Sequence, residues 1–214
     1  MSLATHFYIH IATVVIAAIA GLVNYDRRNK ILLPVIIVLI CIAISSTTSL
    51  LAGRYLRENR PVNHFINPVM LTCWGLFFIQ VLEDPRIKKY VTWATVALVL
   101  FSLTSSAITG LFKTPWYVMR AATIFNMMLG GLLLIQTLEL PSRVNILTNT
   151  YFLIALGIVW FNMISSLNFF LSDFARNHKP TDLFIGQLHW YSNYIYYSIL
   201  ALAMLFQKKL LKNV

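Results

Sequence analysis

The chain has 214 residues, of which 58% are hydrophobic and only 11% are charged, and its mean hydropathy is +0.72. A soluble domain carries about a quarter charged residues, so this composition excludes an ordinary soluble protein and indicates a membrane protein. The net charge of +10 does not indicate nucleic-acid binding. The basic residues stand in small groups at the ends of apolar stretches, as they do beside membrane spans.

Seven apolar stretches follow one another along the chain, each of roughly 20 residues and long enough to cross a hydrocarbon core of about 30 Å. Short connections link them, so we expect an all-α fold, a single seven-helix transmembrane domain over residues 1–214 that lies in the lipid bilayer. The first stretch lacks the basic residues that open a signal peptide, and we interpret it as a span. The predicted spans are residues 4–23, 31–53, 63–82, 90–112, 118–139, 150–172 and 183–206.

The basic residues also predict an orientation. Of the 17 Lys and Arg residues, ten lie on the side of the C-terminal tail and seven on the side of the N-terminus. Because cytoplasmic loops are richer in Lys and Arg, we expect the N-terminus outside the cell and the C-terminus in the cytoplasm.

The last predicted span carries a polar stripe within GQLHWYSNYIYYSI, residues 186–199. Its polar side chains are spaced at offsets of 0, 3, 4, 7 and 8 residues, which places them on one face of a helix. A polar stripe in lipid is costly unless it faces protein, water or a ligand. The stripe consists of His189, Ser192, Asn193, Tyr196 and Tyr197.

Successive spans cross the bilayer in alternating directions, which assigns each residue to one half of the bilayer. By this assignment, the polar residues of the other spans gather in the half nearest the N-terminus. This asymmetry predicts a polar pocket in the outer half of the bilayer, closed below by an apolar floor. We predict a ligand-binding site there that consists of His189, Asn193, Tyr196, Tyr197, Asn162, Ser166, His10 and Asn67.

Helix packing is a second explanation for the same residues. Ser and Thr are frequent where membrane helices meet, and Asn can join helices by a hydrogen bond. Tyr and Trp, including Trp190, also gather at membrane interfaces without forming a site. The two explanations differ in the expected cost of replacing His189 or Asn193 with Leu.

Several function classes lack the residues that they need. No Asp, Glu, Lys or Arg lies deep in a predicted span, where ion-coupled transporters carry such residues. The last span has no lysine for a retinal Schiff base, and neither H-E-x-x-H nor G-x-S-x-G occurs. We expect no enzymatic activity, catalytic residue, metal, cofactor or nucleic-acid partner. Cys41 and Cys73 fit small packing residues.

The chain resembles small seven-helix bacterial membrane proteins of unknown function and the seven-helix membrane modules of sensor histidine kinases. The shared features are the helix count, the short loops and the run SNYIYYSILAL before a basic tail. This resemblance implies a bacterial cytoplasmic (inner) membrane and a receptor- or sensor-like module that binds an unknown small ligand. No kinase domain follows FQKKLLKNV, so we expect such a sensor to signal through a membrane or cytoplasmic partner protein.

A facilitative transporter of a small neutral solute is the alternative function. Residues 44–67 and 164–193 share an I-S-S motif, a basic loop that ends in Pro61 or Pro180, and a His followed by an Asn. The first three helices would then match the last three, with the fourth as a linker. This 3+1+3 parallel repeat is the plan of SWEET-type sugar facilitators.

Overall fold

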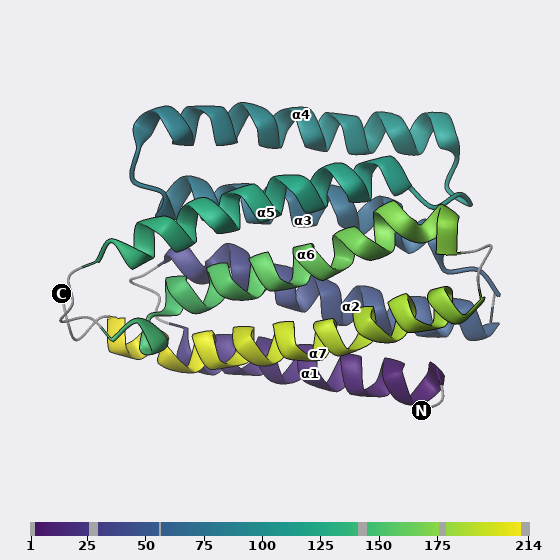
Figure 1. The fold of residues 1–214 in the computed structure, drawn as a ribbon, viewed down its shortest axis with the longest axis horizontal. Helices are drawn as coiled ribbons and strands as arrows, with labels where there is room; N and C mark the ends of the chain where they lie inside the picture. Colours follow the sequence, from purple (N-terminus) through teal and green to yellow (C-terminus); the bar gives the residue numbers. More distant parts are fainter. Residues whose placement is uncertain (1–2, 26–29, 56, 141–144, 176–178, 211–214) are drawn as a thin grey trace. The chain divides into compact units, whose positions relative to one another are not determined.

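The computed structural model describes residues 3–25, 30–55, 57–140, 145–175 and 179–210. Within these residues the fold is all-α, and each predicted span coincides with one α-helix (Figure 1). The α-helices are α1 (Leu3–Asn24), α2 (Leu33–Tyr55), α3 (Arg60–Val81), α4 (Pro85–Thr109), α5 (Trp116–Leu138), α6 (Thr150–Ala175) and α7 (Lys179–Leu210), and the 3₁₀ helices are η1 (Lys30–Leu32) and η2 (Ile146–Thr148).

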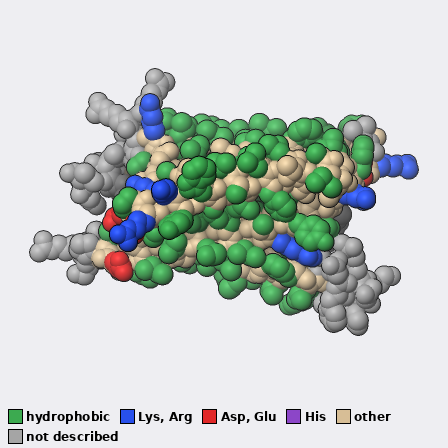
Figure 2. All heavy atoms as spheres, turned by 90° about the horizontal axis from the view of Figure 1, so that it is seen from above, with side chains coloured by type: hydrophobic (Ala, Val, Ile, Leu, Met, Phe, Trp, Pro, Cys, Tyr) green, Lys and Arg blue, Asp and Glu red, His purple; other side chains and the backbone are tan. Residues whose placement is uncertain are grey.

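Six of the described helices, α1 to α6, are long and apolar enough to cross a membrane, which indicates a membrane location. On the face drawn in Figure 2, hydrophobic side chains cover most of the surface and Lys and Arg side chains lie toward the helix ends. Helix α7 has 32 residues but does not reach the same apolarity, because its polar stripe interrupts the apolar sequence. The seventh span, over residues 183–206, stays a prediction.

Local sequence signals determine where several helices begin and end. Asp84 caps α4 by accepting a hydrogen bond from the Arg86 backbone N–H at 2.7 Å, and a proline follows it at the first helical position. Gly110 ends α4 with a φ of 80°, a left-handed conformation that suits glycine. The Asn149 side chain accepts hydrogen bonds from the backbone N–H groups of Tyr151 and Phe152 at the start of α6.

The helices group into two compact units. Unit 1 consists of Met1–Asn24 and Thr123–Val214, and in it α7 packs against both α6 and α1 (Figure 1). Unit 2 consists of Tyr25–Ala122, and in it α3 packs against both α2 and α4. The contacts within the two units do not test the predicted 3+1+3 repeat, which stays a prediction. Short loops make consecutive helices neighbours, whereas ring contacts hold α1 against α7.

Small residues let the helices approach closely in both units. In unit 2, a Cβ atom on Gly75 of α3 would overlap the side chain of Thr95 on α4. In unit 1, a Cβ atom on Gly157 of α6 would lie 3.2 Å from the ring of Tyr196 on α7. Membrane helices associate largely through such close packing, because lipid tails are as apolar as the side chains they would replace.

Gly75→Ala should destabilise the protein, because the new methyl group would push α3 and α4 apart. Overpacking of this kind costs about 1–3 kcal/mol. Gly131→Ala on α5 is the matched control, since a Cβ atom there meets nothing within 4 Å. We expect thermal unfolding in detergent to show a lower Tm for Gly75→Ala and an unchanged or raised Tm for Gly131→Ala. Equal Tm values for the two variants would contradict the close contact between α3 and α4.

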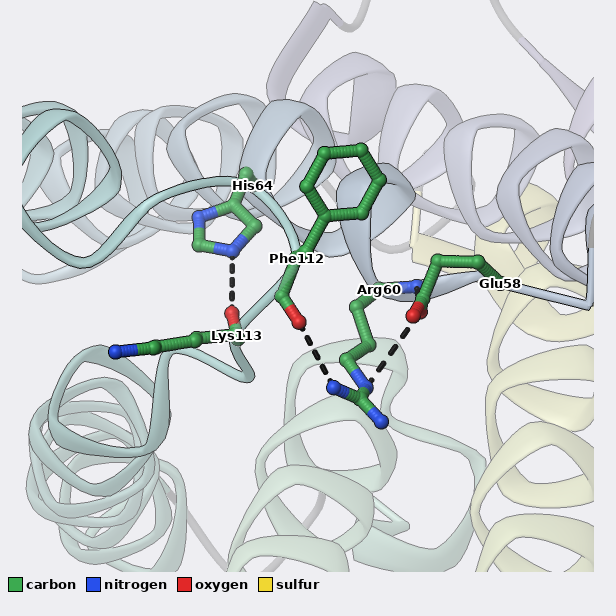
Figure 3. Close-up of polar contacts among 5 residues, drawn as sticks. All are labelled: Glu58, Arg60, His64, Phe112 and Lys113. Atoms are coloured by element: carbon green, nitrogen blue, oxygen red, sulfur yellow. Dashed lines mark hydrogen bonds and ion pairs between the residues drawn. The ribbon is translucent and has the colours of Figure 1, made fainter.

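The first turn of α3 holds the loop between α4 and α5 (Figure 3). The buried His64 donates a hydrogen bond from Nε2 to the Lys113 carbonyl at 2.7 Å, and its Nδ1 lies 2.8 Å from Ser106 Oγ. One turn earlier, Arg60 donates from Nη1 to the Phe112 carbonyl at 2.8 Å. Backbone carbonyls outside a helix need such donors. His64, a polar residue near the start of a predicted span, therefore ties a loop to unit 2.

His64→Leu should lower the free energy of unfolding by about 1–3 kcal/mol, because the Lys113 carbonyl and the Ser106 hydroxyl lose their shared partner. Phe65→Leu is the control at the next position, where the side chain is 67% exposed. It should change the free energy by less than about 0.5 kcal/mol. Denaturant titration of both variants in detergent measures the difference. If His64→Leu behaves like Phe65→Leu, the tie does not contribute to stability.

Candidate functional site

The polar stripe of α7 lies on a buried face in unit 1, as its spacing predicts. The exposed fractions of Ser192, Asn193, Tyr196 and Tyr197 are 1%, 5%, 4% and 4%, and His189 is half-buried. Tyr191 and Ile195, between them on the helix, are exposed, so the stripe itself lies on the inward face of α7. This face meets α1 on one side and α6 on the other.

Helix α1 contributes His10 to this face. The ring of His10 lies edge to face with Tyr197 at a centroid distance of 5.3 Å and with Trp190 at 5.9 Å. His10 is buried, and its contact Trp190 is the residue next to His189 on α7. Histidines from the first and last described helices therefore belong to the same contact region of unit 1.

Helix α6 covers the other side of the same face. Phe161 stacks on Tyr196 with a centroid distance of 4.7 Å and an interplanar angle of 17°, and its ring lies 5.8 Å from that of His189. Ser165 Oγ lies 3.5 Å from His189 Nδ1, and Gly157 leaves room for the Tyr196 ring. His189 is thus enclosed between a serine hydroxyl and an aromatic ring.

The two buried asparagines of the predicted site hydrogen-bond to their own helices. Asn193 Nδ2 donates to the His189 carbonyl at 2.8 Å, and Asn162 Nδ2 donates to the Ile158 carbonyl at 2.7 Å. Asparagines that join helices would instead donate to a neighbouring helix. These two amide nitrogens therefore contribute no interhelical hydrogen bond.

Ser192 differs from both asparagines. Its hydroxyl oxygen is buried and has no hydrogen-bond partner among the described residues. Most buried polar side-chain atoms in proteins have such a partner, so an unpaired hydroxyl within a polar face marks a place where water or a ligand can bind.

The structure brings six of the eight predicted site residues together in unit 1, namely His10, Asn162, His189, Asn193, Tyr196 and Tyr197. Ser166 is half-buried and donates to the Met163 carbonyl of its own helix at 2.6 Å, and the adjacent Ser165 is the residue that contacts His189. Successive helix positions point about 100° apart, which explains the shift by one residue. Asn67 lies on α3 in unit 2, and its Nδ2 is buried without a partner in the described part of the chain.

Three residues at the same α1–α7 contact were absent from the predicted site. His6 Nδ1 lies 2.6 Å from Tyr194 Oη, which also donates to the His6 carbonyl at 3.2 Å. The His6 ring stacks on Trp190 and Tyr194 at centroid distances of 5.7 and 6.1 Å. Trp190 therefore packs against α1 rather than serving only as an interfacial residue. The four-residue spacing of His6 and His10, which places both on one face of α1, is the signal that could have identified this contact.

We call this set of residues the α1–α6–α7 cluster. It consists of His6, His10, Phe161, Asn162, Ser165, His189, Trp190, Ser192, Asn193, Tyr194, Tyr196 and Tyr197. Its members offer ring faces, hydroxyls and amides but no Asp, Glu, Lys or Arg side chain. Among the described residues, no group of three or more His, Cys, Asp or Glu side chains could hold a metal ion.

Comparisons with protein-family models, curated proteins and solved structures find no match to this chain. The cluster's chemistry suits a small uncharged molecule that stacks on rings and forms hydrogen bonds.

Replacement of Asn193 and of Tyr194 should affect stability in different ways. Asn193→Leu leaves no unpaired partner on another helix, because the Asn193 amide nitrogen donates within α7. The same holds approximately for His189→Leu, because the hydrogen bond between His189 and Ser165 of α6 is long, at 3.5 Å. We expect both variants to keep or raise the Tm in detergent. Tyr194→Phe removes a hydroxyl bonded to α1 and should cost about 0.5–1.5 kcal/mol.

A clear loss of stability from both Asn193→Leu and His189→Leu would contradict this expectation. It would favour the packing explanation for the stripe, and α7 would then no longer be a candidate for ligand binding.

Proposed function

We propose that this protein is an integral membrane protein with a receptor- or sensor-like role, and that it binds a small ligand at the α1–α6–α7 cluster in the outer half of the bilayer. The buried, unpartnered Ser192 hydroxyl is the observation that carries the proposal. It lies on a polar face that also contains His189 and Asn193, and burial of such a face costs free energy. A protein keeps costly polar groups where they serve a function.

The hydrogen bonds of the asparagines support a ligand over a purely structural role. Asn162 and Asn193 donate to their own helices, so neither amide nitrogen holds α6 to α7. Close packing at Gly157 and the stacking of Phe161 on Tyr196 already hold these helices together. The polar groups on this face are therefore available for recognition.

Signalling would proceed along α7, which is one continuous helix from Lys179 to Leu210. At the end away from the cluster, Gln207 Nε2 lies 3.5 Å from the Gly21 carbonyl, so α7 and α1 are in contact along much of their length. A ligand that shifts α7 against α1 at the cluster would move its far end as well, because a helix is stiff. In the proposed orientation that end is cytoplasmic, where a partner protein would receive the signal.

The alternative of a solute carrier has less support. It rests on the 3+1+3 repeat, and the contacts described within the units pair α1 with α7 and α3 with α2 and α4. No described contact now favours two equivalent three-helix repeats related in that way.

Analysis of small molecules that copurify with the protein tests the ligand proposal. We expect mass spectrometry to find one such molecule in wild-type protein held in lipid nanodiscs, and to find at least tenfold less of it in Ser192→Leu, which fills the site with apolar atoms. Ser198→Leu is the matched control on the exposed face of α7 and should retain the molecule. Equal amounts in all three proteins, or none in the wild type, would contradict the proposal. Uptake of that molecule into liposomes that contain the protein would indicate a carrier.

A further inference from the structure

Two buried oxygen atoms in unit 1 have no hydrogen-bond partner among the described residues. They are the Ser192 hydroxyl oxygen on α7 and the Asn126 side-chain carbonyl oxygen on α5. A buried polar atom without a partner costs free energy in an apolar surrounding, so each of these atoms calls for a hydrogen-bond partner. The Asn126 oxygen can only accept a hydrogen bond, and the Ser192 hydroxyl can accept one as well as donate one.

Contacts between α5 and α6 place Asn126 opposite Asn162. A Cβ atom on Gly130 of α5 would lie 3.0 Å from Ile158 of α6, so these two residues face each other. Asn126 lies one turn before Gly130 on the same face of α5, and Asn162 lies one turn after Ile158 on the same face of α6. Helices α5 and α6 are consecutive and run in opposite directions. A turn backward along α5 and a turn forward along α6 are therefore displacements in the same direction in space. Asn126 and Asn162 are therefore at one level and on facing sides.

Contacts between α6 and α7 place Ser192 at the same level. Gly157 of α6 meets Tyr196 of α7, and Phe161, one turn further along α6, contacts both His189 and Tyr196. Ser192 lies between His189 and Tyr196 in the sequence and one turn from Tyr196 on the same face. It is therefore level with Phe161 and with the adjacent Asn162.

The asparagines at this level each keep a side-chain oxygen that can accept a hydrogen bond from another partner. Asn162 and Asn193 each use the side-chain Nδ2 on a carbonyl of their own helix. Each side chain keeps its oxygen, which can only accept a hydrogen bond, and one further N–H for other partners. Ser192 and Asn126 add two oxygens that have no partner. This level of unit 1, which we call the acceptor layer, consists of Asn126, Asn162, Ser192 and Asn193.

We propose that the acceptor layer binds an uncharged ligand through hydrogen bonds that the ligand donates from at least two hydroxyl or N–H groups. The inference rests on the proposed function and specifies the ligand's chemistry. None of the four side chains carries a charge, so a carboxylate, a phosphate or an organic cation would be desolvated here without a counter-ion. The adjoining rings of Phe161 and Tyr196 favour a ligand that also has a flat apolar face.

A site that accepts hydrogen bonds should reject a molecule of the same shape that cannot donate them, because the acceptors then stay buried and unpaired. Resorcinol is a suitable probe, since it is flat, uncharged and carries two hydroxyl donors. 1,3-Dimethoxybenzene has the same ring without a donor, and 3-hydroxybenzoate has the same ring with a negative charge.

The inference is tested by measuring how the three probes bind to the full-length protein in nanodiscs. A change in Tm that saturates with probe concentration measures the binding. We expect resorcinol to bind, and each of the other two probes to bind at least tenfold more weakly. Ser192→Ala and Asn126→Leu should each weaken resorcinol binding about two- to tenfold, the range for one neutral hydrogen bond. Ser198→Ala, on the exposed face of α7, should leave it unchanged.

The outcomes separate this inference from the proposed function. If 1,3-dimethoxybenzene binds as tightly as resorcinol and His10→Ala or Tyr197→Ala abolishes binding of both, the cluster binds ligands but the donor chemistry is wrong. If resorcinol binding is insensitive to both Ser192→Ala and Asn126→Leu, these oxygens hold only water and the acceptor layer is not a site. Absence of saturable resorcinol binding to the wild type would overturn the inference outright. Copurification of a ligand that has no hydroxyl or N–H donor would do so as well, while the proposed function would stand.

Discussion

Hydrogen bonding within each helix is the constraint on which the rest of this structure depends. In an apolar surrounding every buried polar group needs a partner, and a helix supplies backbone carbonyls three or four residues back. Thr13, Thr72 and Thr137 all donate to such carbonyls at 2.8 to 2.9 Å. Most polar groups of a helix are thereby hydrogen-bonded within that helix. The shapes of the helix surfaces then decide which helices pack together. Glycines and aromatic rings then set the distances between them.

Among the described residues, several of the hydrogen bonds between helices involve a residue near a helix end. His64 ties α3 to a loop in unit 2, and Tyr194 ties α7 to the first turns of α1 in unit 1. Thr150, the first residue of α6, donates to the Ala203 carbonyl of α7 at 3.3 Å. Ser192 and Asn126 take no part in these ties, because the Ser192 hydroxyl and the Asn126 side-chain oxygen have no hydrogen-bond partner among the described residues.

Sequence periodicity predicts which face of a helix is buried but not which helix covers it. The stripe on α7 is an example, since its offsets place five residues on one face and that face is buried. The partners of the stripe were harder to predict. Ser165 rather than Ser166 contacts His189, because one residue turns a helical side chain by about 100°. His10 was correctly grouped with residues of α7, but His6, Trp190 and Tyr194 at the same contact were missed. Asn67 was grouped with residues that lie in another unit, because nothing in the local sequence of a helix specifies which distant helix covers it.

The contact between the first and last helices has a consequence for synthesis of the chain. Helices α2, α3 and α4 are neighbours in sequence, so unit 2 can assemble soon after the ribosome has made them. Helix α1 is made first, yet its partner α7 follows more than a hundred residues later. During that interval its histidine-bearing face lacks its final cover, and the insertion machinery or other transient neighbours must shield it. The α1–α6–α7 cluster therefore forms only after α7 has been inserted, and its completion can report that step.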